Sequence, residues 1–328
     1  MTISYFLAFF VTFLLGLLIS PLIFAFSKKI KAGQTILHYV KEHAGKQGTP
    51  TMGGLIFIIP AFITSLLFAR QDYLFLVVTV LTMFSYGLLG FLDDYIKVYY
   101  KQNLGLKPYQ KIIGQLGISL IISLFVYNHV GSDIYLPFSN TTVNLGFFII
   151  PAVIFVFIAT VNSVNLIDGL DGLCGSVSVN FLIFFLLISL VLAKNFTNPY
   201  LTELNNLCIS VCSLLGGIVA FLVFNIFPAK IFMGDTGSLA IGGFVACLCV
   251  LTKQMLLIPF LGLLYVITAV SDIVQVVYFK RTRKRVFKMA PLHHHFQMCG
   301  IHENKIVFSY FTVSFILNLI CLALYIYM

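Results

Sequence analysis

The stretch "ISYFLAFFVTFLLGLLISPLIFAF", residues 3–26, has no charged side chain, and the basic segment "SKKIK", residues 27–31, follows it at once. As an α-helix, these 24 residues rise about 36 Å, which exceeds the roughly 30 Å of a bilayer hydrocarbon core. The basic residues follow the apolar run and do not precede it, which is not the order of a cleaved signal peptide. We therefore predict that this stretch is a membrane-spanning helix.

The rest of the 328-residue chain repeats this pattern. Hydrophobic residues make up 60% of it and charged residues 9%, and the mean hydropathy is +1.02. Soluble domains carry about 25% charged residues, so the composition argues against a soluble helical protein. The predicted spans are residues 3–26, 53–69, 73–92, 112–128, 145–161, 174–193, 206–224, 237–252, 255–278 and 306–327. We predict an all-α polytopic integral membrane protein of about ten transmembrane helices, with residues 1–328 forming one domain.

The distribution of lysine and arginine predicts the orientation. Ten spans place both termini on the same side, and with extracytoplasmic termini 17 of the 20 basic residues fall in cytoplasmic segments. The three exceptions are Arg70, Lys194 and Lys253. Since basic residues concentrate in cytoplasmic loops, we expect extracytoplasmic termini and a reactive cytoplasmic face. The segment 128–144 on the other side is expected to be a polar, turn-rich loop.

The first acidic motif is "GFLDDYIK", residues 90–97. Adjacent side chains on a helix diverge by about 100°, so Asp93 and Asp94 are expected to do different jobs. Lys97 lies one helical turn further on. The motif predicts either a site facing a metal or substrate, or a solvated helix end with a local ion pair.

A second acidic motif is "NSVNLIDGLDGL", residues 162–173. Asp168 and Asp171 share a face if this segment is helical, and the glycine after each lets the backbone approach a ligand closely. Such a pair suits Mg²⁺ held through water, or the hydroxyls and base of a nucleotide. The alternative is that these aspartates only cap helix N-termini.

Asp235 lies in a third motif, "FNIFPAKIFMGDTGS", at the start of the eighth predicted span. A helix N-terminus there would present free amides to an anion, and a carboxylate beside it suits a metal bridging protein and phosphate. The simpler alternative is an N-cap. The segment "KQGTPTMGG", residues 46–54, either cradles phosphate or sugar or forms a turn, and it lacks the spacing of a P-loop.

Three consecutive histidines occur in "APLHHHFQ", residues 290–297, after the basic run "FKRTRKRVFK". Consecutive side chains cannot all converge on one ion in a helix or a strand, and structural zinc uses spaced ligands, usually with cysteine. Imidazoles that hydrogen-bond to phosphate or sugar fit better, and the basic run also suits anionic lipid headgroups. Acids, histidines and lysines at one rim predict two anionic partners, one soluble and one lipid-borne, with Mg²⁺ between them.

Together, "GTPTMGG", "GFLDDYIK", "NLIDGLDGL", "FMGDTGSLA" and "FKMAPLHHHF" resemble the phospho-N-acetylmuramoyl-pentapeptide-transferase family, over about residues 28 to 305. The resemblance implies a homodimer in the bacterial cytoplasmic membrane, with its catalytic cleft facing the cytoplasm and no nucleic acid partner. It implies transfer of phospho-MurNAc-pentapeptide from UDP-MurNAc-pentapeptide to undecaprenyl phosphate, with Mg²⁺. The products are lipid I and UMP, in the first membrane step of peptidoglycan synthesis.

Functional residues follow from the resemblance motif by motif. It implies that the catalytic residues are Asp93, Asp94, Asp235 and His293, with Asp235 as the metal ligand. It implies that the substrate-binding residues are Lys46, Lys97, Asn165, Asp168, Gly169, Leu170, Asp171, Asn225, Phe232, His294 and His295. One departure is Gln297, which stands where a glutamate is common in the family.

Two mechanisms and two other functions stay open at this point. The lipid phosphate attacks directly, with Asp93 or Asp94 taking its proton, or the reaction proceeds through a phospho-aspartate. A related enzyme would transfer GlcNAc-1-phosphate instead, although the "APLHHHF" form argues against it. A transporter would place charges near the midplane of broken helices, whereas most of the acids here gather at the predicted cytoplasmic rim.

Overall fold

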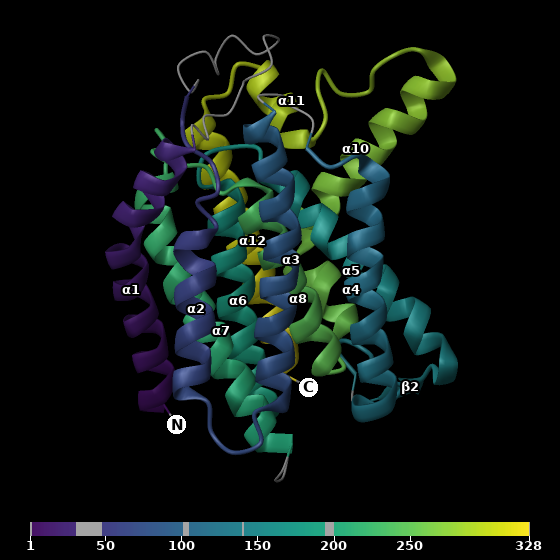
Figure 1. The fold of residues 1–328 in the computed structure, drawn as a ribbon. Helices are drawn as coiled ribbons and strands as arrows, with labels where there is room; N and C mark the ends of the chain where they lie inside the picture. Colours follow the sequence, from purple (N-terminus) through teal and green to yellow (C-terminus); the bar gives the residue numbers. More distant parts are fainter. Residues whose placement is uncertain (1, 31–47, 101–104, 140, 194–199, 328) are drawn as a thin grey trace.

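The computed structural model describes residues 2–30, 48–100, 105–139, 141–193 and 200–327, and it shows a bundle of long helices (Figure 1). The long helices are α1 (Thr2–Lys29), α3 (Leu74–Tyr99), α4 (Pro108–Phe125), α5 (Ile149–Ile167), α6 (Leu173–Leu192), α7 (Tyr200–Asn225), α8 (Gly234–Leu251), α10 (Leu263–Thr282) and α12 (Glu303–Tyr327). The shorter elements are α2 (Leu55–Phe68), η2 (Val126–Val130), β1 (Asp133–Tyr135), β2 (Thr142–Asn144), η3 (Gly146–Phe148), η5 (Met255–Leu257), α9 (Ile258–Leu261) and α11 (Leu292–Met298).

Within these described ranges, nine helices are long and apolar enough to cross a membrane. The predicted polytopic, helical architecture is therefore confirmed. The second predicted span corresponds to α2, which is apolar but only 14 residues long. Both ends of the chain lie toward the end of the bundle opposite α11 (Figure 1).

Helix α8 forms the centre of the bundle. Every residue from Thr236 to Leu251 is buried, and a helix that is apolar all round belongs in the interior. Small residues let its neighbours approach closely, as is common between membrane helices. A Cβ placed at Gly90 of α3 would collide with the backbone oxygen of Asp235, and one at Gly242 would meet Val161 of α5 at 2.6 Å. These contacts bring the ends of α3 and α5 to the start of α8.

The ninth predicted span is not one helix. The chain from 255 to 282 forms η5 and α9, bends at Gly262, and continues as α10, which leans away from the bundle at its far end (Figure 1). Gly262 donates its N–H to Ile258 O and accepts the N–H of Tyr265, so the helix restarts there. Hydropathy alone did not reveal the bend, because both sides of it are apolar.

The segment 128–144 is also more ordered than predicted. It contains a two-stranded antiparallel hairpin in which Asp133 pairs with Asn144. The N–H of Tyr135 donates to Lys253 O at 2.9 Å, so the hairpin packs on the end of α8. Strands of three residues are too short to produce a clear alternating pattern in the sequence.

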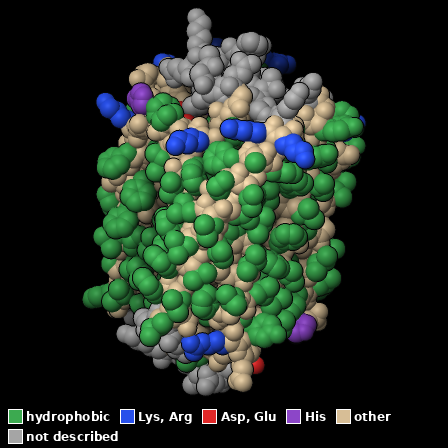
Figure 2. Space-filling view, turned by 60° about the vertical axis from the view of Figure 1, so that its left-hand side comes forward, with side chains coloured by type: hydrophobic (Ala, Val, Ile, Leu, Met, Phe, Trp, Pro, Cys, Tyr) green, Lys and Arg blue, Asp and Glu red, His purple; other side chains and the backbone are tan. Residues whose placement is uncertain are grey.

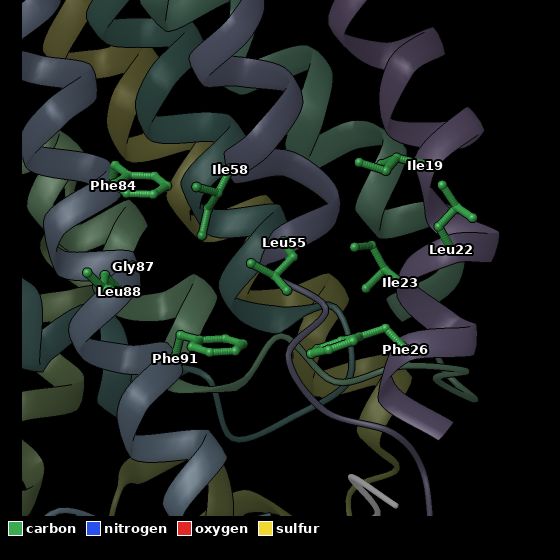
Figure 3. A pocket seen from close by; sticks show the side chains of 10 residues that line it. All are labelled: Ile19, Leu22, Ile23, Phe26, Leu55, Ile58, Phe84, Gly87, Leu88 and Phe91. Atoms are coloured by element: carbon green, nitrogen blue, oxygen red, sulfur yellow. The ribbon is translucent and has the colours of Figure 1, made fainter. Parts of the chain in front are cut away.

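The surface has a broad hydrophobic belt, and in one view lysines and arginines gather above it at the end that carries α11 (Figure 2). An apolar pocket of about 450 Å³ opens between α1, α2 and α3. Phe26 and Phe91 line the lower part of it in Figure 3, and Leu55 lies between and above them. Phe91 is one helical turn from Asp94, so this pocket lies just below the acids.

Candidate active site

Three carboxylates meet where the end of α3 crosses the start of α8. One oxygen each from Asp93, Asp94 and Asp235 lies within 4.8 Å of the other two. Asp93 and Asp94 are only 2% and 3% exposed. Burying several carboxylates so close together is costly unless cations and hydrogen bonds offset their charge, so their partners decide what the site can do.

Asp94 caps the N-terminus of α8. Its Oδ1 accepts the N–H of Asp235 at 3.2 Å, and its Oδ2 accepts the N–H and the Oγ1 hydroxyl of Thr236 at 2.9 and 2.7 Å. The first N–H groups of a helix have no partner within the helix, and here a carboxylate from another helix supplies it. The alternative that Asp235 is the N-cap is therefore wrong: α8 has no side-chain cap of its own.

Asp93 has different partners from Asp94, as expected for adjacent residues on a helix. Its Oδ1 accepts the N–H of Leu106 at 2.8 Å, and its Oδ2 lies 2.6 Å from Lys97 Nζ. The ion pair predicted between Asp93 and Lys97 is therefore present. This ion pair does not exclude a metal or substrate site, because Lys97 Nζ also lies 2.9 Å from Oδ2 of Asp235.

Asp235 is held by three side chains from three helices. Its Oδ2 lies 2.9 Å from Lys97 Nζ and 2.8 Å from Lys111 Nζ, and its Oδ1 accepts Nδ2 of Asn165 at 2.7 Å. Asn165 also donates to Ser238 Oγ at 2.9 Å. The resemblance implied that Asn165 binds substrate, and in the structure its side chain contacts Asp235.

The donor set fits a hard divalent cation. Mg²⁺ is bound by one or two carboxylates together with phosphate oxygens, and three carboxylates at this spacing supply them. Asp235 is a better candidate than Asp94, because the partners of Asp235 are side chains that can move, whereas Asp94 accepts backbone N–H groups of α8. Lys97 and Lys111 both contact Asp235, so their positive charges lie where the phosphates of a substrate would bind.

The loop between α5 and α6 carries the second acidic motif, and it is not helical. Asp168 ends α5, and residues 169–172 form turns before α6 begins at Leu173. Loss of hydration, with the charges of Asp235, Asp94 and Asp171, raises the pKa of the Asp168 carboxyl well above its usual range. Asp168 therefore belongs to the same electrostatic site as the three carboxylates.

The far side of this loop is fixed by hydrogen bonds. The N-cap residue of α6 is Gly172, and Oδ2 of Asp171 accepts the N–H of Ala229 at 3.0 Å. The N–H of Gly172 donates to Asn225 Oδ1 at 2.9 Å, and Nδ2 of Asn225 donates to Ile231 O. Asn225 thus joins the loop to the segment that leads to Asp235. The Leu170 side chain is buried in the core.

The three histidines take different environments along α11. His293 is fully buried, and within the described part of the chain neither of its ring nitrogens has a hydrogen-bond partner. Burial, together with His294, lowers the pKa of His293 well below its usual range, so the ring is neutral. A Cβ on Gly169 would collide with Nε2 of His293 and meet Nε2 of His294 at 2.9 Å.

His295 lies elsewhere on α11. Its Nδ1 accepts the N–H of Lys288 at 3.1 Å, which attaches it to the basic segment. The expectation that the three side chains do not converge is confirmed. The structure therefore brings His293 and His294, but not His295, to the loop between α5 and α6.

The glycine-rich motif that precedes α2 lies beside the Asp235 segment. The N–H of Phe232 donates to Pro50 O, and Phe232 O accepts the N–H of Gly53, each at 2.8 Å. A Cβ on Gly234 would also meet Thr51 Oγ1 at 2.7 Å. Lys46, predicted to bind substrate from this motif, lies outside the described residues.

Two residues at the site were not predicted from the sequence. Lys111 contributed only to the count of basic residues, although it binds Asp235. Glu303 was not singled out, although its Oε1 accepts the N–H of Asp171 at 2.6 Å. The available signals were a lysine in the first turn of one apolar helix and a carboxylate in the first turn of another.

The sequence matches two models of known protein families. Residues 75–253 match the family model described as glycosyl transferase family 4. Residues 46–58 match phospho-N-acetylmuramoyl-pentapeptide-transferase signature 1. The chain therefore belongs to a class of membrane-embedded glycosyl transferases.

Curated relatives identify the family more closely. A phospho-N-acetylmuramoyl-pentapeptide-transferase of Thermoanaerobacter sp. (strain X514) is 45% identical over 309 residues, covering 93% of this chain and 94% of the relative. Proteins of the same name from Clostridioides difficile (strain 630) and Caldicellulosiruptor bescii are 39% and 38% identical, and each alignment covers more than 90% of both chains. This chain belongs to the phospho-N-acetylmuramoyl-pentapeptide-transferase family, which confirms the resemblance seen in its motifs.

Proposed function

We propose that this protein transfers phospho-MurNAc-pentapeptide from UDP-MurNAc-pentapeptide to undecaprenyl phosphate. The products are lipid I and UMP. The observation that carries the proposal is the group of Asp93, Asp94 and Asp235 beside Lys97 and Lys111, at one end of an apolar helix bundle. Such a site meets a soluble diphosphate from one side and a lipid phosphate from the other.

In this reaction an oxygen of the lipid phosphate attacks the β-phosphorus of the UDP-sugar, and the bond from that phosphorus to the UMP oxygen breaks. Asp93 is the better candidate to take a proton from the lipid phosphate, because Asp94 is committed to capping α8. Lys97 and Lys111 offset the negative charge gathered on the phosphates. The two ring nitrogens of His293, which have no partner among the described residues, would hydrogen-bond to substrate once substrate binding exposes the buried ring.

A divalent cation fits the same site, and we propose Mg²⁺ held by Asp235. When bound, it would neutralise diphosphate charge and orient the phosphates. Asp168, Gly169 and Asp171 would bind the nucleotide, together with the residues around Phe232. The apolar pocket lined by Phe91, one helical turn from Asp94, supports a lipid-borne acceptor (Figure 3).

We further propose that residues 1–328 act as one catalytic unit, which works as a homodimer in the bacterial cytoplasmic membrane. The site would face the cytoplasm, where UDP-sugars are made. The excess of basic residues in the segments at that end of the bundle supports this orientation.

The test is UMP release by purified protein in detergent, with UDP-MurNAc-pentapeptide, undecaprenyl phosphate and Mg²⁺. We expect UMP only when the lipid is present, and its loss with EDTA and in Asp235→Asn. Activity with UDP-GlcNAc in place of UDP-MurNAc-pentapeptide would reject the proposed substrate. UMP release that persists in EDTA would reject the metal.

A further inference from the structure

Glu303, the first residue of α12, reaches across to the loop between α5 and α6. Its Oε1 accepts the backbone N–H of Asp171 at 2.6 Å. Glu303 is 7% exposed and Asp171 is 5% exposed, so this hydrogen bond is shielded from water. Hydrogen bonds to a carboxylate are short and strong, and the first turn of a helix is a favourable place for negative charge. The buried carboxylate of Glu303 is therefore well accommodated.

The same loop is held from a second direction by the C-terminal part of the chain. His293, ten residues before Glu303, packs so tightly on Gly169 that a Cβ there would collide with its Nε2. Both ends of the turn 169–171 therefore contact one segment, residues 291–303. His302, next to Glu303, also packs edge-on against Phe227, with the ring centroids 5.3 Å apart. The start of α12 therefore contacts both the turn 169–171 and the segment after α7 that carries Phe227.

The acids are held by other contacts. Asp235 is bound by Asn165, which precedes the loop, and by Lys97 and Lys111. Asp94 is bound by the N-terminus of α8. Loss of the hydrogen bond from Asp171 N–H to Glu303 would therefore alter the loop while leaving the acids in place.

We infer that Glu303 is a positioning residue for the nucleotide part of the substrate. It fixes the turn 169–171 against α11 and α12, in the conformation that binds the uridine nucleotide, without touching the substrate itself. This inference rests on the proposed function, because it assumes that the turn binds the nucleotide. It assigns Glu303 an effect on binding and not on phosphoryl transfer.

The test compares Glu303→Ala and Glu303→Gln with a matched control. The control is Glu203→Ala, because Glu203 Oε2 also accepts a backbone N–H, that of Phe75 at 3.0 Å, at the opposite end of α3. Without this acceptor the buried N–H of Asp171 is left unpaired, so the turn is less well preorganised to bind the nucleotide. We expect E303A to raise KM for UDP-MurNAc-pentapeptide roughly tenfold, with kcat within about twofold of wild type.

Rescue by glutamine is the second part of the result. The amide oxygen of glutamine can accept the same hydrogen bond, so E303Q should retain a KM within about threefold of wild type. E203A should leave KM unchanged even where it lowers the unfolding temperature. Calorimetric titration with UMP should show the same order of affinities without any turnover. If E303A does not fold, Glu303→Asp, which is one methylene shorter, takes its place.

Several results would overturn the inference. One is a KM for E303A equal to that of wild type, and another is an equal rise in KM for E303A and E203A. A fall in kcat alone would place Glu303 in the chemical step instead. If wild type turns over and E303A binds UMP as tightly as wild type does, only the positioning role of Glu303 is rejected. A wild type that neither turns over nor binds UMP rejects the proposed function, and the inference with it.

Discussion

Lys111 Nζ lies 2.8 Å from Asp235 Oδ2, although the two residues are 124 positions apart and α4, which carries Lys111, contributes no acid to the site. Lys97 Nζ lies 2.9 Å from the same oxygen of Asp235. The two lysines place positive charge beside the three carboxylates, where a phosphate would bind. Lys111 is therefore placed to act on the substrate as well as on Asp235.

The first prediction concerns this lysine. Lys111→Ala should lower kcat by about 100-fold, because a preorganised cation at the reacting phosphates is lost. Lys111→Arg should recover part of the activity, since the positive charge is kept. The exposed Lys305, at the start of α12, provides the control Lys305→Ala. Equal activity of K111A and K305A in a UMP-release assay would contradict the role given to Lys111.

The second prediction concerns the cap of α8. Asp94→Asn should lower the free energy of unfolding by about 1–3 kcal/mol, because an amide has one oxygen for the donors that the two oxygens of Asp94 accept. The measurement is thermal unfolding in detergent. Asp133→Asn, in the hairpin at the other end of the bundle, is the control and should unfold like wild type. A D94N protein as stable as D133N would show that Asp94 is not a structural cap.

The third prediction concerns the close approach of α3 and α8. Gly90→Ala should destabilise the protein by about 1–3 kcal/mol and reduce activity, because its Cβ would collide with the backbone oxygen of Asp235. Gly117 is a matched helical glycine, with no atom within 4 Å of its Cβ position. Gly117→Ala should therefore be neutral, or stabilise by up to about 1 kcal/mol. Similar unfolding temperatures for the two variants would argue against tight α3–α8 packing.

The fourth prediction concerns pH. The pKa of Asp168 is raised in the folded protein by burial and by neighbouring acids, so its protonated form stabilises the fold. That contribution is fully present below the unfolded pKa of about 4 and is lost as pH rises through the raised pKa. Asp168→Asn cannot ionise. As pH rises above about 4, the unfolding temperature of wild type should fall relative to that of D168N. Parallel curves would show that the Asp168 pKa is not raised.

The fifth prediction concerns orientation. Cys299 is the exposed cysteine among seven free cysteines, and it follows α11 at the end that carries the acids. A membrane-impermeant maleimide should label it only after cells are permeabilised. Gln71→Cys in a Cys299→Ser background lies at the opposite end of α3 and should be labelled in intact cells. The reverse pattern would overturn the predicted topology.

The spans were predictable because hydropathy is a local property. A helix such as α1 must hide its backbone from hydrocarbon, and a run of apolar residues records that requirement directly. Asp93, Asp94 and Asp235 were recognisable as site residues because acids at the ends of apolar helices are costly without a function. The bend at Gly262 and the hairpin formed by β1 and β2 were missed, because neither changes the local hydropathy pattern enough.

By itself, the sequence determined that the chain is a helical membrane protein, where its helices run, and which motifs bear acids and histidines. Only the tertiary structure decided how those residues divide their tasks. Asp94 caps a helix that begins 140 residues later in the chain, Lys111 neutralises Asp235, and Glu303 holds a loop 132 residues before it. Such pairings depend on how closely helices pack, which is set at positions like Gly90 by the partner helix and leaves no periodic trace in the sequence.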